Sequence, residues 1–143
     1  MGTTLRLDLS GFDRLMEKLD RLGGDLKEVT EDALGQAAET IEWDTVDAVQ
    51  KPNLPRGGKY SNGDTEASIV RDAKVEWEGT TGSIGVGFDF GKPGAGGFLI
   101  TGTPRMAPVG PLTEIYKRKR YMSQIQKDMQ EIVSDAIKER MEG

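Results

Sequence analysis

Residues 74–88 read Lys74-Val75-Glu76-Trp77-Glu78-Gly79-Thr80-Thr81-Gly82-Ser83-Ile84-Gly85-Val86-Gly87-Phe88 and predict a β-hairpin. The first five alternate between apolar and polar side chains as a strand does, residues 79–82 form the turn, and residues 83–88 return as a second strand. Ile84, Val86 and Phe88 then share one face and supply the core of the sheet. Gly85 and Gly87 lie on the other face, where the missing side chains allow a bulky group to approach closely.

The N-terminal residues show the same alternation. Leu5, Leu7 and Leu9 fall on one face of residues 3–9, which predicts a short half-buried strand. Residues 10–13 end this strand and begin a helix that closes at Gly23-Gly24, because glycine accepts the left-handed geometry of a helix end. The apolar positions of this helix recur at helical spacing: Phe12, Leu15, Met16, Leu19 and Leu22.

Two longer helices follow from the same periodicity. Asp25 is the expected cap of a helix that stops near Pro52, and its small residues Ala33, Ala37 and Ala38 permit close packing. We interpret its apolar stripe as facing the chain's own core, the alternative being a coiled-coil partner site. A last helix is predicted from about Leu112 to Met141, with a heptad-like stripe at Ile115, Met122, Ile125, Met129, Ile132 and Ala136.

Together these elements predict an α+β fold. A small antiparallel sheet, made of the N-terminal strand and the central hairpin, is expected to pack with long N-terminal and C-terminal helices in one domain over residues 1–143. Residues 51–64 and 91–97 are rich in glycine, with prolines, and are expected to be flexible loops. Residues 65–72 are expected to begin as a short helical turn.

Composition narrows the classes of function. The chain of 143 residues contains no cysteine and no histidine, which removes thiolate nucleophiles, the commonest general base and the commonest zinc ligands. We therefore expect no enzyme, no metal site and no cofactor. The longest apolar run is too short to span a membrane, and the N-terminus does not have the pattern of a secretory signal, so no membrane association is expected.

Charge is unevenly distributed along the chain. The net charge is −5, but residues 1–50 hold 12 acidic against 5 basic residues (−7), while residues 51–143 hold 12 acidic against 14 basic residues (+2). An acidic total argues against duplex DNA as the main partner, because phosphate neutralisation drives that affinity. The asymmetry suggests contact between the acidic half of one copy and the basic half of another, the alternative being ordinary solvated helix faces.

The glycine-rich region and the acidic pairs do not make a chemical site. Residues 87–93 have a Gly-Lys pair, but the spacing differs from a phosphate-binding loop and Pro93 replaces the hydroxyl residue that would hold magnesium. Asp44 and Asp47 share a helix face without any convergent polar group, so solvent exposure is the default interpretation.

Lys117, Arg118, Lys119 and Arg120 form the only dense basic run. On a continuous helix their charges would fan around the circumference and could not form one flat patch. Contact with phosphate, such as passing DNA, and salt bridges to the acidic helix at residues 25–47 explain the run equally well.

The order of several loose motifs resembles a known family. The motifs are Ser10-Gly11-Phe12-Asp13-Arg14-Leu15 with Leu19 and Gly23-Gly24, the Ala-rich helix, the Gly85-Val86-Gly87-Phe88 strand, and Gly102-Thr103 followed by Met106-Ala107-Pro108. Over most of residues 5–140 this order is similar to that of the neck or tail-completion proteins of long-tailed bacteriophages, also described as head–tail joining or minor tail proteins. The segment Pro108-Val109-Gly110-Pro111-Leu112 stands where such proteins tend to carry an aromatic-rich stretch.

The resemblance implies a structural virion protein. Its copies would form a ring, expected to be a hexamer, that joins the connector or head-closure protein to the tail tube or tail terminator, with DNA passing transiently through the lumen. Localisation would be the head–tail junction of the virion, and the host cytoplasm during assembly. The expected interface residues are Arg56, Lys59, Tyr60, Gly102, Thr103, Pro104, Arg105, Lys117, Arg118, Lys119 and Arg120. The alternatives are a tail terminator or head-closure protein, and a small protein or nucleic-acid interaction module.

Overall fold

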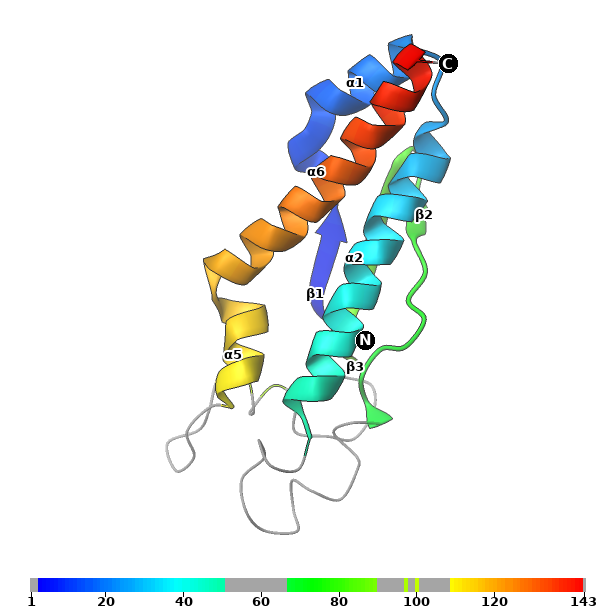
Figure 1. Cartoon of the computed structure of the whole chain (residues 1–143). Coiled ribbons are helices and arrows are strands. Elements are labelled where there is room, and N and C mark those ends of the chain that lie inside the picture. Colours follow the sequence, from blue (N-terminus) through cyan, green and yellow to red (C-terminus); the bar gives the residue numbers. More distant parts are fainter. Residues whose placement is uncertain (1–2, 51–66, 90–96, 98–99, 101–108, 143) are drawn as a thin grey trace.

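The computed structural model describes residues 3–50, 67–89, 97, 100 and 109–142 (Figure 1). Within these residues the protein is α+β, as the sequence predicts, with helices forming most of the structure. The elements are, in chain order, β1 (Thr3–Asp8), the 3-10 helix η1 (Ser10–Phe12), α1 (Asp13–Arg21), α2 (Leu26–Ala48), β2 (Glu76–Glu78), β3 (Thr81–Asp89), α5 (Gly110–Lys117) and α6 (Lys119–Glu142).

The three strands form one antiparallel sheet in the order β1-β3-β2. The predicted hairpin is confirmed, but its turn is shorter than expected. Glu78 pairs with Thr81, so only Gly79 and Thr80 form the loop, and Gly82 already belongs to β3. Gly79 has a φ of +62°, the geometry that a two-residue hairpin loop requires.

The pairing of β1 with β3 is irregular near Gly87. Leu5 pairs with Val86 and Thr3 with Asp89, so β3 contains one more residue than β1 across this interval. Gly87 takes a φ of +97°, and a Cβ there would lie 2.6 Å from the Cβ of Thr4 and 3.0 Å from the hydroxyl of Tyr116. The expected close approach is therefore found at this glycine, whose bulge lets α5 approach the strand.

A short segment before β2 also pairs with β3. Ile69 forms an antiparallel bridge with Phe88; Val70 N donates to Gly87 O at 2.7 Å, and Asp89 N donates to Ser68 O at 2.7 Å. Because β1 already occupies one edge of β3 at this level, residues 68–70 lie on the edge that β2 uses. Ala67 is helical and Ser68 lies in a turn, as expected for the start of residues 65–72, and the bridge at Ile69 follows them.

Helix α2 is the centre of the packing. It contacts β3 on one side and α6, α5 and α1 on the other. Asp25 caps it as predicted, because its carboxylate accepts a hydrogen bond from Glu28 N at 3.1 Å. Its small residues Ala33, Ala37 and Ala38 are all buried, which lets the sheet and α6 pack closely against it.

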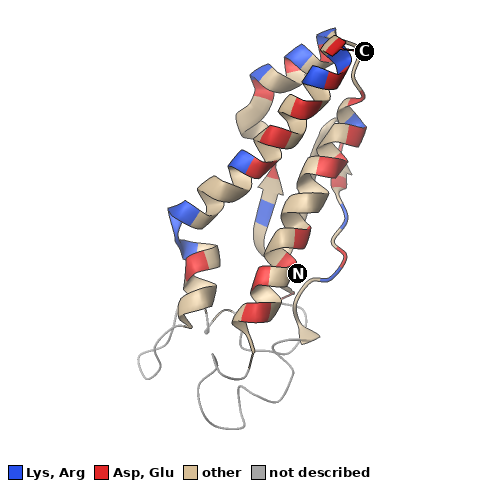
Figure 2. Ribbon diagram, in the orientation of Figure 1, with Lys and Arg blue, Asp and Glu red and all other residues tan. Residues whose placement is uncertain are grey.

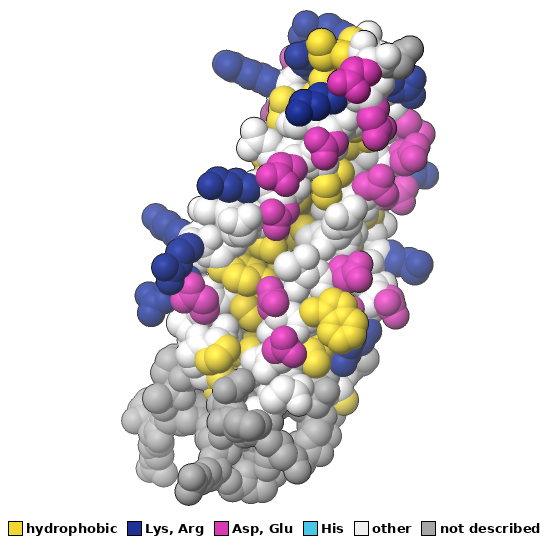
Figure 3. All heavy atoms as spheres, in the orientation of Figure 1, with side chains coloured by type: hydrophobic (Ala, Val, Ile, Leu, Met, Phe, Trp, Pro, Cys, Tyr) yellow, Lys and Arg dark blue, Asp and Glu magenta, His cyan; other side chains and the backbone are white. Residues whose placement is uncertain are grey.

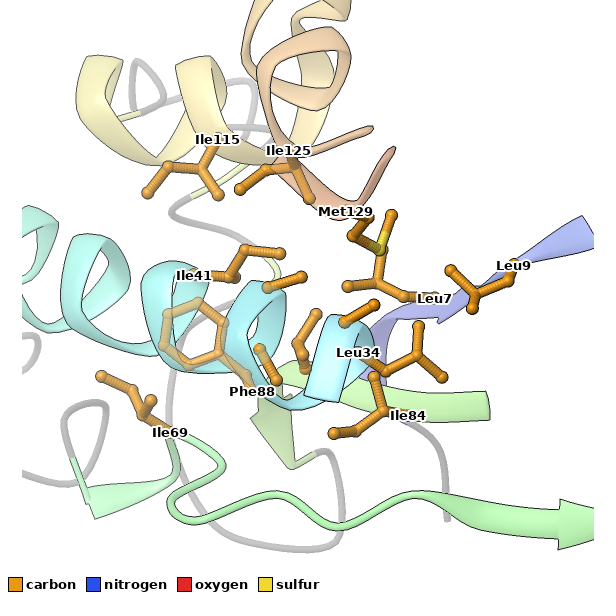
Figure 4. Close-up of a cluster of buried hydrophobic side chains, with 14 of the residues drawn as sticks. Leu7, Leu9, Leu34, Ile41, Ile69, Ile84, Phe88, Ile115, Ile125 and Met129 are labelled. Carbon is orange, nitrogen blue, oxygen red and sulfur yellow. The ribbon is translucent and has the colours of Figure 1, made fainter. Parts of the chain in front are cut away.

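The core lies between the sheet and the helices (Figure 4). Ile84, Val86 and Phe88, the predicted core face of β3, are each no more than 2% exposed. Figure 4 shows side chains from every layer meeting there: Leu7 from β1 and Leu9 directly after it, Leu34 and Ile41 from α2, Ile84 and Phe88 from β3, Ile115 from α5, and Ile125 and Met129 from α6.

The single C-terminal helix predicted over residues 112–141 is wrong. Arg118 has extended backbone (φ −97°, ψ 131°) and separates α5 from α6. The heptad-like stripe changes with it: the buried positions of α6 are Ile125, Met129, Val133 and Ile137, which step by four, while Ile132 and Ala136 are only half-buried. A four-residue row winds around a helix and is typical of helices that cross obliquely.

Candidate interface

The four consecutive cations form an exposed corner where α5 meets α6. We call Lys117, Arg118, Lys119 and Arg120 the basic corner; all four are exposed. Because the chain turns at Arg118, Lys117 ends one helix and Lys119 begins the next. The four charges therefore do not fan around one helix as predicted, and Figure 2 shows blue segments gathered at this corner.

The basic corner makes little use of the acidic residues in its own chain. Arg120 approaches Glu114 at 3.3 Å; the Arg120 side chain is largely exposed and that of Glu114 is partly exposed. Among the described residues, neither Lys117, Arg118 nor Lys119 forms an ion pair. The suggestion that the run pairs with the acidic helix at residues 25–47 is thus not met by the part of the chain that the structure describes.

Two of these cations lie where a helix disfavours them. Lys119 and Arg120 occupy the first turn of α6, which contains no acidic residue. The N-terminal end of a helix carries partial positive charge, so each cation there costs up to about 1 kcal/mol when exposed. Their position is unfavourable for the isolated chain, and a bound anionic surface would offset this cost.

Two tyrosines fix the corner to α2. The hydroxyl of Tyr116, in α5, lies 2.6 Å from Oγ1 of Thr45, and the hydroxyl of Tyr121, in α6, donates to the carboxylate of Asp44. Burial raises the pKa of Tyr116 to about 12. Burial, together with Asp44, also raises the pKa of Tyr121. Both hydroxyls therefore remain protonated donors, holding the residues on either side of Arg118 against adjacent positions of α2.

Helix α2 carries the complementary charge. It contains seven acidic residues and one basic residue, and the exposed acids are Glu28, Glu31, Asp32, Glu39 and Asp47. Figure 3 shows acidic side chains spread over this side of the molecule, while dark blue cations project from the edge at the α5–α6 corner. The acidic side chains of α2 and the cations of the basic corner thus lie apart, although further cations lie at the top and right edge of the same view (Figure 3).

An exposed tryptophan interrupts this acidic surface. Trp43 is 56% exposed although its helix is otherwise apolar only on the buried side. It borders a groove of about 380 Å³ between α2 and residues 72–74, which we call the Trp43 groove. Its lining is Gly35, Ala38, Glu39, Glu42, Trp43, Asp72, Ala73 and Lys74.

The two acidic residues of α2 in this groove differ in their surroundings. Glu42 accepts a hydrogen bond from Asp72 N at 2.8 Å and pairs with Arg71 at 3.5 Å, so its charge is already compensated. Glu39 is exposed and forms no ion pair with any described residue. Lys74 opposes it from the other wall. Glu39 and Trp43, one turn apart, are therefore the side chains of α2 available to a partner.

A second groove lies at the opposite end of the sheet. Its volume is about 730 Å³, and Leu9, Met16, Leu26 and Trp77 line it together with the hairpin loop. Asp8 is at its rim, where hydrogen bonds from Ser10 lower the pKa of the carboxyl. No group of three or more metal-ligating side chains occurs among the described residues, and no helix there is long and apolar enough to cross a membrane.

Of the predicted interface residues, the structure brings together only the basic run. The others, Arg56, Lys59, Tyr60, Gly102, Thr103, Pro104 and Arg105, lie outside the described residues. The described residues next to those segments, at the ends of α2 and β3 and the start of α5, lie at one end of the molecule (Figure 1). Trp43 was not among the predicted residues, although an aromatic residue on the polar face of an amphipathic helix is a recognisable signal.

Comparisons with known proteins leave the geometry as the main guide: no family model, no curated protein and no solved structure matches this chain significantly.

Proposed function

We propose that this protein is a structural component of a bacteriophage head–tail junction. Its copies form a ring between the connector and the tail tube and allow DNA to pass through the lumen. In this role it acts by binding other proteins, with neither catalytic residues nor a cofactor. Its partners are further copies of itself and the neighbouring connector, head-closure, tail-tube or terminator proteins.

The observation that carries the proposal is the separation of charge over the surface. Three cations of the basic corner form no ion pair with any described residue, and the acidic surface of α2 faces another direction (Figures 2 and 3). Complementary surfaces on different sides of one protomer suit head-to-tail contacts, which close into a ring when the rotation allows. The order of sequence motifs supports the same assignment, and the α+β fold is compatible with it.

The experiment is electron microscopy of lysates from a phage with a nonsense codon early in this reading frame. Full heads beside separate finished tails are the expected result, and purified protein added to the lysate should restore joined particles. The same images distinguish the neighbouring roles: tails of irregular length would indicate a terminator, and heads that have lost their DNA would indicate head closure. Intact infectious virions would refute a role in the junction.

A further inference from the structure

The exposed aromatic residue of α2, Trp43, is suited to bind a cationic side chain. Trp43 presents more than half of its surface next to Glu39, an exposed carboxylate without an ion pair among the described residues. Arginine and lysine bind favourably over an indole face, and a neighbouring carboxylate strengthens the attraction for a cation. The lining also contains Lys74, but Glu39, Glu42 and Asp72 outnumber it, so the Trp43 groove favours a basic side chain over an acidic or purely apolar one.

The chain itself supplies such side chains. Lys117, Arg118 and Lys119 are exposed and form no ion pair among the described residues, although the chain is acidic overall. In Figure 1 the α5–α6 corner and the groove between α2 and residues 72–74 lie at opposite edges of the molecule. One copy cannot join its own corner to its own groove, so the contact has to form between two copies.

We propose that the Trp43 groove is the docking site for the basic corner of a second copy, with Trp43 and Glu39 receiving Lys117, Arg118 or Lys119. The contact is heterologous, so each copy uses its groove on one side and its corner on the other. It relieves the two unfavourable features described above, an exposed indole and cations at the start of α6. Nucleic acid is the competing occupant of the corner, but it cannot account for the groove, whose exposed acidic residue would repel phosphate.

Two variants test the groove and the basic corner independently. The groove variant combines Trp43→Ala with Glu39→Gln, and the corner variant combines Lys117→Glu with Lys119→Glu. All four side chains are exposed, so circular dichroism should show unchanged folding. Matched controls are Met141→Ala, which removes another exposed hydrophobic side chain, and Lys127→Glu with Lys138→Glu, which reverses two exposed cations elsewhere on α6.

Sedimentation velocity at low ionic strength gives the first readout. Wild type and both controls should self-associate, and each variant alone should do so at least about tenfold more weakly. A mixture of the two variants should form a one-to-one dimer that grows no further, because it retains one intact groove and one intact corner. Variants that assemble like wild type, or a mixture without dimers, would overturn the proposal.

Cross-linking decides the case in which wild type sediments as a monomer. Because the chain contains no cysteine, Glu39→Cys and Lys119→Cys place unique thiols on the two surfaces. A disulfide between the two proteins should form faster than with a control thiol at Lys138, which is also exposed on α6 but far from the corner. Equal rates would refute the contact. Salt-sensitive binding of duplex DNA that the corner variant abolishes, without cross-linking to the groove, would assign the corner to nucleic acid instead.

This inference specifies the contact within the proposed ring and therefore rests on the proposed function, but the two fail separately. Phage that joins heads to tails normally with the groove variant would refute the contact and leave the junction role intact. Intact virions from the nonsense phage would refute the junction role while the purified protein could still self-associate through this contact.

Discussion

Replacing Thr45 and Tyr116 tests how the corner is held, and the structure gives the size of each effect. Thr45 is completely buried, and its Oγ1 lies 2.6 Å from Ile41 O and 2.6 Å from the Tyr116 hydroxyl. The single hydroxyl proton of Thr45 goes to the Ile41 carbonyl, so Tyr116 must donate to Thr45. Each variant of the pair therefore leaves a different group without its partner.

Thr45→Val leaves a largely buried Tyr116 hydroxyl without an acceptor, which should destabilise the fold by about 1–3 kcal/mol. Tyr116→Phe removes the donor and leaves Thr45 bonded to Ile41, so its cost should be about 0.5–1.5 kcal/mol. With both changes no polar group remains unpaired at this contact. The double variant should thus be about as stable as Tyr116→Phe alone, with a coupling of about 1 kcal/mol or more between the two sites.

Urea denaturation followed by circular dichroism measures the free energy of unfolding of the four proteins in this cycle. Equal m-values would show that the changes act on the folded state. The reasoning is refuted if the two single effects add to within about 0.5 kcal/mol, because additivity means that the hydroxyls do not interact. It is equally refuted if Thr45→Val costs less than Tyr116→Phe.

Three further predictions concern the bulge at Gly87, the start of α2 and the ionisation of Tyr116. Gly87→Ala should cost about 2 kcal/mol or more in urea unfolding, because a φ of +97° strains alanine and its Cβ would clash with Thr4, whereas Gly11→Ala, with open space around it, should be nearly neutral. Asp25→Ala should lower the free energy of unfolding by about 0.5–2 kcal/mol through loss of the bond to Glu28 N, and a smaller loss for Asp25→Gly would identify capping as the cause. Because the pKa of Tyr116 rises from its usual 10 to about 12 on folding, its titration should leave the free energy of unfolding unchanged below pH 10 and lower it by about 2–3 kcal/mol as the pH rises through 12. Tyr116→Phe should therefore flatten the alkaline limb of a stability–pH profile, and an unchanged profile would contradict the assignment.

Local patterns predicted the elements whose geometry depends on local physics. Alternation in residues 83–88 identified the buried face of β3, because a strand sends every second side chain to the same side. The cap at Asp25 and the left-handed Gly23 (φ +78°) were predictable for the same reason, since each satisfies the end of its own helix.

The elements that depend on distant partners were not predictable. No glycine or proline marks the break at Arg118, and the residues around it have good helix propensity. The break coincides with two tyrosines bound to neighbouring residues of α2, a tertiary effect that overrides local preference. The pairing of Ile69 with Phe88 was likewise not predictable. An isolated bridge needs only one residue in register, so the sequence around Ile69 shows no alternation of apolar and polar residues.

The candidate interface also has one part that local sequence predicted and one part that depends on distant residues. The basic run was visible in the sequence because its four residues are adjacent, but whether they pair with α2 depended on the turn at Arg118. The Trp43 groove was missed because its walls come from α2 and from residues 72–74, which are far apart in the chain. The loop residues expected at the interface, such as Arg56 and Arg105, stay predictions.

The short strand β2 has a consequence for how copies of this protein meet. An open sheet edge invites strand addition by another chain and hence aggregation, a hazard that grows with local concentration. Here the outer edge of β3 is taken partly by residues 68–70 and partly by β2, whose own free edge is only three residues long and carries Glu76 and Glu78 on either side of Trp77. Arg6 pairs with Glu76 at 2.9 Å, so among the described residues it is mainly the carboxylate of Glu78 that repels an incoming copy of this short edge. Growth by strand pairing is therefore discouraged on this side of the sheet, and association there is left to side chains on the helices.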